Sequence, residues 1–178
     1  MRAGGWLVPF IDEAFLARIA EWTMPAEAFM FGGRTYEAFA RDWPRMDDPA
    51  DKVATRLNRG RKYAASRSPL EASWENSVVV PDALAKVAEL RAEGRGELQI
   101  HGSTTLARAL FAEGLIDELR LATAPVVIGP GRRLFSGDLP AIGLKRLSSE
   151  TTPAGLALDR YAVTGPAAFG SYAPEIAG

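Results

Sequence analysis

Cysteine is absent from this sequence of 178 residues, and histidine occurs only once, at His101. Without cysteine the protein has no disulfide bridge, no thiolate metal ligand and no cysteine nucleophile. A single histidine excludes a multi-histidine metal centre and leaves little for Ser-His-Asp chemistry. We therefore expect no metal site.

An excess of one charge is also lacking, because 21 Lys and Arg residues face 22 Asp and Glu residues for a net charge of −1. This balance is not typical of proteins that bind nucleic acid or anionic membranes. No apolar run approaches the ~20 residues that span a bilayer, and the first residues lack the apolar segment of a signal peptide. We expect a cytoplasmic protein with a small-molecule substrate and with neither nucleic acid nor membrane as a partner.

The composition is that of an ordinary globular domain, with hydrophobic residues at 47%. A chain of this length buries roughly 70% of its unfolded surface, enough to fold without metal or disulfide. We expect one domain over residues 1–164. The remaining residues, 165–178, are rich in glycine and proline and predict a loosely ordered tail.

The spacing of apolar residues predicts an alternation of helices and strands. The expected helices cover residues 12–22, 35–42, 47–57, 82–93 and 104–113. The expected strands cover residues 27–31, 62–66, 77–80, 98–101, 118–123, 144–148 and 156–163, and a further apolar stretch covers 125–128. This order predicts an α/β sandwich whose mostly parallel sheet is finished by antiparallel C-terminal strands.

Three glycine-bearing junctions follow predicted strands, at residues 31–36, 100–106 and 125–135. Glycine lets the backbone approach a ligand closely, and a helix N-terminus offers free N–H groups to phosphate. The junctions therefore suit a dinucleotide pyrophosphate at the carboxyl edge of the sheet. Taken singly, each glycine is better explained as the end of a strand or helix. Neither a Rossmann fingerprint nor a P-loop is present.

Residues 56–68 form the one dense basic cluster of the sequence. Such a run is most often a solvated face. In a second interpretation, Ser66 and Arg67 at a strand end bind a phosphate monoester such as the 2′-phosphate of NADP. His101 likewise has two interpretations, a ring satisfied within the structure or an acid–base group, and we favour the first. Asp117 and Glu118 are expected to be turn and cap residues.

Several motifs together resemble one known family. They are Gly32-x-Arg34-Thr35-Tyr36-Glu37, His101-Gly102-Ser103-x-x-Leu106, Gly114-Leu115-Ile116-Asp117-Glu118-Leu119, Pro125-Val126-Val127-Ile128-Gly129-x-Gly131-x-x-Leu134-Phe135 and Thr151-Thr152-x-x-Gly155. In this order and spacing they resemble the bacterial bifunctional deaminase-reductase C-terminal domain family, whose namesake acts in riboflavin biosynthesis. The resemblance extends from about Gly4 to Val163, nearly the whole chain.

The resemblance implies a dihydrofolate-reductase-like fold, a three-layer sandwich with helices on both faces of a mixed sheet. It also implies an NADPH-dependent reductase that transfers hydride to a small heterocyclic or ribosylamino-pyrimidine-like substrate. The cofactor-binding residues that it implies are Gly32, Arg34, Thr35, Ser66, Arg67, Gly102, Ser103, Thr104, Leu106, Gly129 and Gly131. No catalytic residue is assigned.

Two departures from the family pattern stand out. Gly33 occupies the place where the family usually has an arginine, so Arg34 or Arg61 would have to serve the phosphate. The first strand of the family, with its Ser-hydrophobic-Asp-Gly loop, is not found before Gly5-Trp6. Trp6 and Asp12 are expected to line the substrate side.

Two other classes of function stay open. A nucleotide- or ligand-binding module without turnover would have the same fold, and so would a dimeric structural protein that binds no ligand. A homodimer is expected, because strands 118–123 and 156–163 offer an apolar surface.

Overall fold

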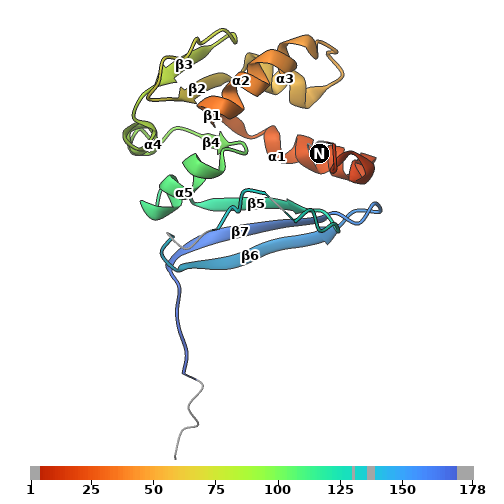
Figure 1. Cartoon of the computed structure of the whole chain (residues 1–178), viewed down its shortest axis with the longest axis vertical. Helices are drawn as coiled ribbons and strands as arrows, with labels where there is room; N and C mark the ends of the chain where they lie inside the picture. Colours follow the sequence, from red (N-terminus) through yellow and green to blue (C-terminus); the bar gives the residue numbers. More distant parts are fainter. Residues whose placement is uncertain (1–4, 130, 136–138, 172–178) are drawn as a thin grey trace, which may run out of the picture.

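The computed structural model describes residues 5–129, 131–135 and 139–171. It contains five α-helices and seven strands among these residues, with two short 3-10 helices at Val8–Phe10 and Trp43–Arg45 (Figure 1). The helices are α1 (Glu13–Thr23), α2 (Gly33–Asp42), α3 (Lys52–Arg59), α4 (Ala83–Ala92) and α5 (Thr104–Ala112). The strands are β1 (Ala26–Gly32), β2 (Arg61–Ala65), β3 (Ser77–Val80), β4 (Glu97–Ile100), β5 (Glu118–Thr123), β6 (Ile142–Thr151) and β7 (Ala157–Pro166).

The strands form two sheets. The first is parallel with the order β3-β2-β1-β4, and the second is antiparallel with the order β5-β7-β6. Figure 1 shows the antiparallel sheet as a separate layer below the parallel one. The expected α/β fold is confirmed. The one mixed sheet that was expected is present as two sheets, and the break lies between β4 and β5.

The parallel sheet is covered on both faces, as expected. Alternate residues of β1 point to opposite sides, so Phe29 and Phe31 pack with residues of α2 and α3. Met30 packs on the other side with Val87 of α4 and Leu110 of α5. Because helices bury both faces, β1 reads as a nearly continuous apolar run.

The antiparallel sheet has its own smaller core against α1. Phe15 of that helix packs with Leu156 and Leu158, at the start of β7. Two further side chains hold α1 to this sheet, since Arg18 pairs with Glu150 of β6 and Asp12 accepts a hydrogen bond from the Ala154 N–H at 2.8 Å. Asp12, expected on the substrate side, is thus engaged in these structural contacts.

Several boundaries differ from the predictions. The second helix begins at Gly33 rather than near Thr35, because Gly33 is already helical while Gly32 keeps the extended backbone that ends β1. The third begins at Lys52 rather than at residue 47, since the Asp51 carboxylate caps it by accepting from the Ala54 N–H. The apolar stretch 125–128 forms no strand.

Of the predicted tail, Gly165 and Pro166 complete β7, and residues 172–178 lie outside the described residues. Among the residues that the structure describes, no helix is both long enough and apolar enough to cross a membrane.

Candidate functional site

The first two junctions meet at the carboxyl edge of the parallel sheet. Gly32 ends β1, and its N–H donates to Ser103 Oγ at 2.8 Å. The same hydroxyl donates to the carbonyl of His101 at 3.1 Å, at the end of the neighbouring strand β4. Because β1 and β4 are parallel neighbours, their ends bring the two loops together.

The backbone of the second junction is specialised for this meeting. Gly102 and Ser103 are both left-handed, with φ values of 57° and 54°. This conformation is costly for a residue with a β-carbon, at about 1 kcal/mol, and it turns the Ser103 hydroxyl toward β1. A β-carbon added at Gly102 would lie 3.7 Å from Thr35 Cγ2, and one added at Gly32 would lie 3.9 Å from Leu106 Cβ. Thr35 and Leu106 therefore belong to the same loop cluster.

The two helices that begin here differ from the others in how they begin. Helices α1, α3 and α4 each start with an aspartate whose carboxylate accepts a backbone N–H, at 2.8, 2.9 and 3.0 Å. By contrast, α2 starts after Gly32 and α5 after Ser103, and neither has a side-chain cap. Their first N–H groups are left for an external acceptor, and the helix dipole adds positive potential there. Thr104 is the first residue of α5.

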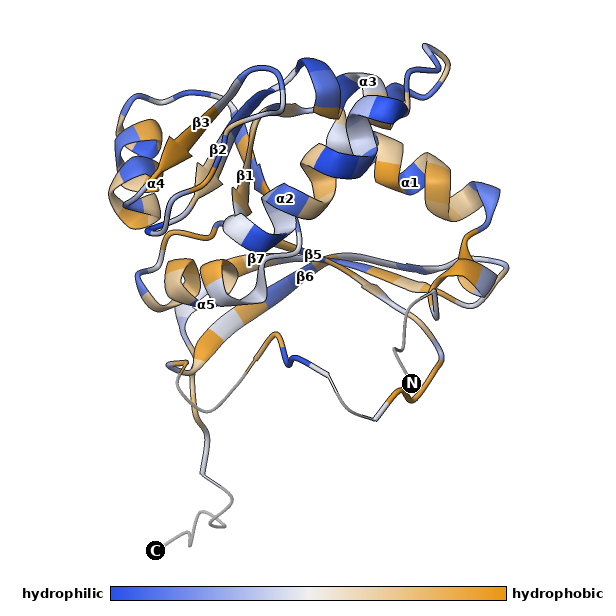
Figure 2. Cartoon of the chain, turned by 45° about the horizontal axis from the view of Figure 1, so that its top comes forward, coloured by the Kyte–Doolittle hydropathy of each residue, from blue (hydrophilic) through white to orange (hydrophobic). Residues whose placement is uncertain are grey.

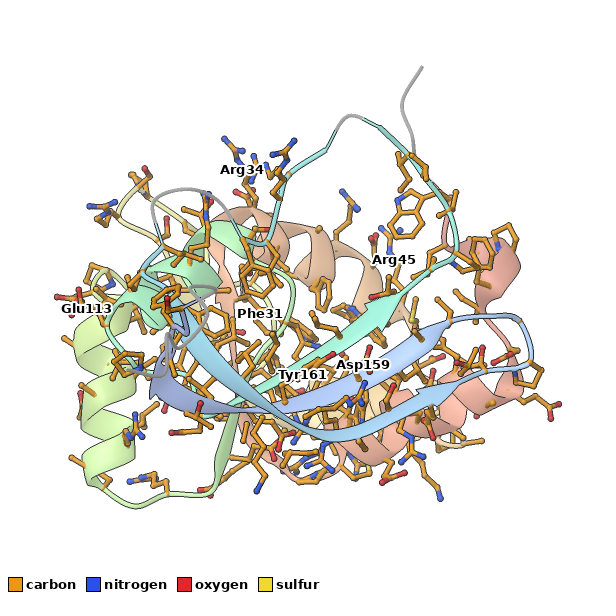
Figure 3. All side chains as sticks on the ribbon, turned by 90° about the horizontal axis from the view of Figure 1, so that it is seen from below. Phe31, Arg34, Arg45, Glu113, Asp159 and Tyr161 are labelled. Atoms are coloured by element: carbon orange, nitrogen blue, oxygen red, sulfur yellow. The ribbon has the colours of Figure 1, made fainter. Side chains whose placement is uncertain are left out.

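The end of β2 joins the same edge. A β-carbon added at Gly33 would lie 3.5 Å from Ser66 Oγ, so the start of α2 touches the residue that follows β2. The Ser66 hydroxyl donates to the Ser68 carbonyl at 2.9 Å, which forms a tight turn. Arg34 and Arg67 are both exposed. Figure 3 shows Arg34 at the periphery, with its side chain directed outward, and Phe31 in the interior.

The third junction stays apart from this cluster. A β-carbon added at Gly129 or Gly131 would meet nothing within 4 Å. Figure 2 shows the described parts of segment 125–135 as a loop outside the two sheets, and its large apolar side chains, Val126, Val127, Ile128 and Phe135, are exposed. The loop reaches α5 through Phe135, whose ring lies 6.1 Å from that of Phe111. The structure thus joins two of the three predicted junctions.

His101 has the structural role expected of it. Its ring lies 5.5 Å from Phe29 and 6.1 Å from Phe31, and its Nε2 is 2.9 Å from Gln99 Oε1. Desolvation lowers the pKa of His101 to about 4, with a further lowering by the charge of Arg120. The ring is therefore neutral at pH 7, so it cannot act on a ligand as an imidazolium acid.

The basic cluster of residues 56–68 is not uniformly exposed, because one of its lysines lies in the core. Lys62 is fully buried, and its Nζ donates to the carbonyls of Leu57, Asn58 and Gly60 at 2.7–2.8 Å. These carbonyls end α3, so this lysine closes a helix C-terminus and is neither a solvated residue nor a phosphate ligand. The sequence pattern did not predict the burial of Lys62, because that burial depends on the position of Trp74, whose ring lies 4.5 Å from Nζ.

Sequence reasoning also missed a charged cluster between the two sheets. Arg120 of β5 donates to both carboxylate oxygens of Glu97 on β4 at 2.9 Å, and to Glu118 at 2.6 Å. Glu118, expected to be a turn or cap residue, also accepts from Arg160 at 2.8 Å. This hydrogen bond is the main reason why the pKa of Glu118 lies below its ordinary value. Asp117 pairs with Arg91 at 2.5 Å.

The family model described as the RibD C-terminal domain matches residues 11–158, most of the chain. The chain belongs to the RibD C-terminal domain family. The resemblance found in the motifs is thereby confirmed. Among curated proteins, the uncharacterized protein YyaP of Bacillus subtilis is 26% identical over 132 residues, which cover 73% of this chain and 70% of YyaP.

Solved structures share the fold of this RibD C-terminal domain. A putative riboflavin biosynthesis protein of Shewanella sp. PV-4 matches with a TM-score of 0.65 at 22% identity, over 86% of this chain and 81% of that one. A pyrimidine reductase-like protein of Corynebacterium diphtheriae matches with a TM-score of 0.59 at 16% identity, over 90% and 85%. RibD of Acinetobacter baumannii matches with a TM-score of 0.63 at 17% identity, over 86% of this chain but only 52% of its own.

Proposed function

We propose that this chain is a cytoplasmic reductase that binds NADPH at the joined junctions. Its proposed substrate is a small heterocyclic or ribosylamino-pyrimidine-like compound, which accepts the hydride at a C=N or C=O carbon. Membership in the RibD C-terminal domain family supports a reductase-like module. When bound, the nicotinamide supplies the hydride, and the protein aligns donor and acceptor and excludes water.

The observation that carries the proposal is the pair of uncapped helices. Helices α2 and α5 begin at one sheet edge, linked by the Gly32–Ser103 hydrogen bond, and both leave their first N–H groups without a side-chain acceptor. A diphosphate offers acceptors for both termini at once. In this proposal the phosphates lie against Gly32, Thr35, Gly102, Ser103 and Thr104, with Leu106 behind them.

The remaining expected residues serve the rest of the cofactor. Ser66 lies against the start of α2, and the exposed Arg67 follows it, so the two together suit a 2′-phosphate. Arg34, at the first turn of α2, supplies charge that Gly33 does not. Gly129 and Gly131 would have to approach from the third loop, and we propose that they do so only when the nucleotide is bound.

The direct test is a calorimetric titration with NADPH, for which we expect micromolar affinity, about −8 kcal/mol. The variant Gly32→Asp places a carboxylate at the start of α2, where it would cap the helix and repel phosphate. Its added β-carbon would make only ordinary contacts, at 3.5 Å from Ser103. We expect this variant to remain as stable as the wild type but to lose NADPH binding. The control is Ala92→Asp, which adds the same charge at the exposed end of α4.

Preference for NADPH is tested by a matched pair of arginines. Arg67 follows the carboxyl end of β2. Arg61, which the sequence offered as a phosphate partner, begins the same strand at the opposite end, away from the junctions. We expect Arg67→Ala to weaken NADPH about tenfold, the worth of one charge-assisted hydrogen bond, and to leave NADH unchanged. Arg61→Ala should alter neither. Equal effects of the two variants on NADPH would reject the 2′-phosphate site.

A nucleotide-binding module without turnover is the second candidate. It is favoured by the state of His101, the one histidine of the sequence, which is buried, and whose pKa of about 4 denies the edge a histidine acid at neutral pH. NADPH binding with no oxidation across pterins, ribosylaminopyrimidines and reactive carbonyls would support this candidate. Oxidation of NADPH with any of these compounds would support the reductase.

A further inference from the structure

An irregular loop, residues 66–76, links β2 to β3 and carries both residues that are proposed for the 2′-phosphate. Between Ala65 and Ser77 the backbone is neither helix nor strand. Most side chains of this loop are exposed, including that of Arg67. A loop with no regular ladder of backbone hydrogen bonds needs other contacts to fix its course.

Trp74 holds this loop to the core, with a side chain that is only 3% exposed. Its indole lies 5.9 Å from the ring of Phe31 on β1, and its Nε1 donates to Asn58 Oδ1 of α3 at 2.9 Å. The half-buried Leu70 packs against the same core cluster. The loop is therefore attached to the core at residues 70 and 74, and Arg67 lies just before the first of these two points.

One side chain ties the backbone of Trp74 to helix α2. The Trp74 N–H donates to the hydroxyl oxygen of Tyr36 at 3.0 Å, and this hydrogen bond is buried. Tyr36 is 1% exposed and lies near the start of α2, which begins at Gly33. One hydroxyl thus connects the helix proposed to bind the diphosphate with the loop proposed to bind the 2′-phosphate.

The first residue of the loop is fixed in another way. The Ser66 N–H donates to the carbonyl of Val80 on β3 at 3.1 Å, and Ser66 also lies against Gly33 at the start of α2. Arg67 extends beyond these contacts, and its exposed side chain follows the course of the loop. The position of its guanidinium therefore depends on how the rest of the loop is anchored.

We propose that Tyr36 and Trp74 are positioning residues that set the preference for NADPH over NADH, an inference that rests on the proposed function. Their hydrogen bond holds the loop at a fixed distance from α2, so that Arg67 meets the 2′-phosphate while the diphosphate lies at the helix start. Both residues are buried, so they act through Arg67 and do not touch the nucleotide. NADH has no 2′-phosphate, and its binding does not depend on where Arg67 lies.

The first test is Tyr36→Phe, which removes the hydroxyl and keeps the ring that packs in the core. Calorimetric titration should show NADPH binding about fivefold weaker than in the wild type, with NADH binding unchanged. The matched control is Tyr63→Phe, which removes a hydroxyl from a half-buried ring of β2 on the α4 side of the sheet and should change neither affinity. Equal weakening of both cofactors by Tyr36→Phe, or no weakening of NADPH, would overturn the inference.

A double-mutant cycle separates positioning from a general loss of structure. If Tyr36 acts through Arg67, then Tyr36→Phe should weaken NADPH binding no further once residue 67 has been changed by Arg67→Ala. A hydroxyl that only stabilised the fold would weaken NADPH by the same factor in both backgrounds. Effects that multiply in the double variant would therefore contradict a positioning role.

Hydrogen exchange of the wild type decides the question if Tyr36→Phe does not fold. At saturation, NADPH should slow exchange of the Trp74 amide about tenfold more than NADH does, because only NADPH binds the loop. Equal protection by the two cofactors would overturn the inference and leave the proposed nucleotide site intact. A wild type that binds neither cofactor would instead reject the proposed function, and the inference with it.

Discussion

Ser103 Oγ lies 2.8 Å from the backbone nitrogen of Gly32, 71 residues earlier in the chain. The bond ties the start of α5 to the end of β1. It also explains why a serine tolerates the left-handed conformation at φ 54°. The two junctions therefore form one structural unit, and their geometry depends on this hydroxyl.

The first prediction concerns that hydroxyl. Ser103→Ala should lower the free energy of unfolding by about 1–3 kcal/mol, because the Gly32 N–H loses its acceptor. Ser103→Gly should be less destabilised than Ser103→Ala, since glycine adopts the left-handed conformation without strain. Urea unfolding measures both. The control is Ser77→Ala, whose buried hydroxyl has no partner and whose removal should cost nothing. Similar losses for Ser77→Ala and Ser103→Ala would contradict the prediction.

The second prediction concerns the buried lysine. Lys62→Met keeps the apolar stem but leaves three backbone carbonyls without their donor, so we expect a loss of at least about 2 kcal/mol. The emission of Trp74 should also change, because Nζ lies 4.5 Å from its ring. The control, Lys86→Met, removes an exposed pair with Glu89 and should leave the melting temperature unchanged. A Lys62→Met protein as stable as wild type would show that water satisfies these carbonyls.

The third prediction concerns acid stability. The pKa of His101 is lowered from 6.5 to about 4, so between these values the unfolded state binds a proton that the folded state does not. The free energy of unfolding therefore falls as the pH drops from 6.5 to 4, by no more than about 3 kcal/mol. His101→Phe should remove this part of the pH dependence.

The comparison with the variant is essential because carboxylates act in the same direction. Salt bridges to Arg160 and Arg120 hold the pKa of Glu118 below its ordinary value, and that contribution is also lost as the pH falls. Wild type and His101→Phe should therefore both lose stability in acid, but the wild type more steeply. Parallel pH profiles would contradict the assignment of a neutral, buried His101.

The fourth prediction concerns the expected homodimer. Leu156 and Leu158 are buried under α1, so the free surface of this sheet is its other face. That face carries Tyr161 of β7 beside Leu119 of β5, and Figure 3 shows the sheet from that side. Light scattering should give twice the mass of the chain, and Tyr161→Glu should give the mass of a monomer. Leu16→Glu, on the exposed side of α1, is the control and should remain dimeric. A wild-type monomer would reject the prediction.

Sequence patterns predicted those features that depend on neighbours along the chain. The positions of the helices followed from apolar spacing and from capping residues such as Asp12 and Asp82, because a helix begins where a local side chain can accept its first N–H groups. The strand before Gly32 and the turn after it were equally local. Where the pattern misled, as at residue 47, a nearby aspartate competed with the true cap, Asp51.

Only part of the candidate site could be predicted from such local patterns. Glycine and serine residues after predicted strands indicated which loops could hold a phosphate, since those residues permit close approach of the backbone. That Gly32 and Ser103 touch, and that Gly129 remains apart, depended on which strands became neighbours, and strand order is not encoded in any local window. The same holds for Lys62, whose burial is fixed by a tryptophan twelve residues later that folds back over it.

The type of fold, most helices and strands, and the absence of cysteine chemistry could all be predicted from residue types and their short-range spacing. Only the folded structure shows that two uncapped helices share one sheet edge and that, among the described residues, β4 and β5 belong to separate sheets. Both are relations between segments distant along the chain. Such relations form only when whole sheets assemble, because the backbone N–H and C=O groups of a strand find their partners on strands that are distant along the chain.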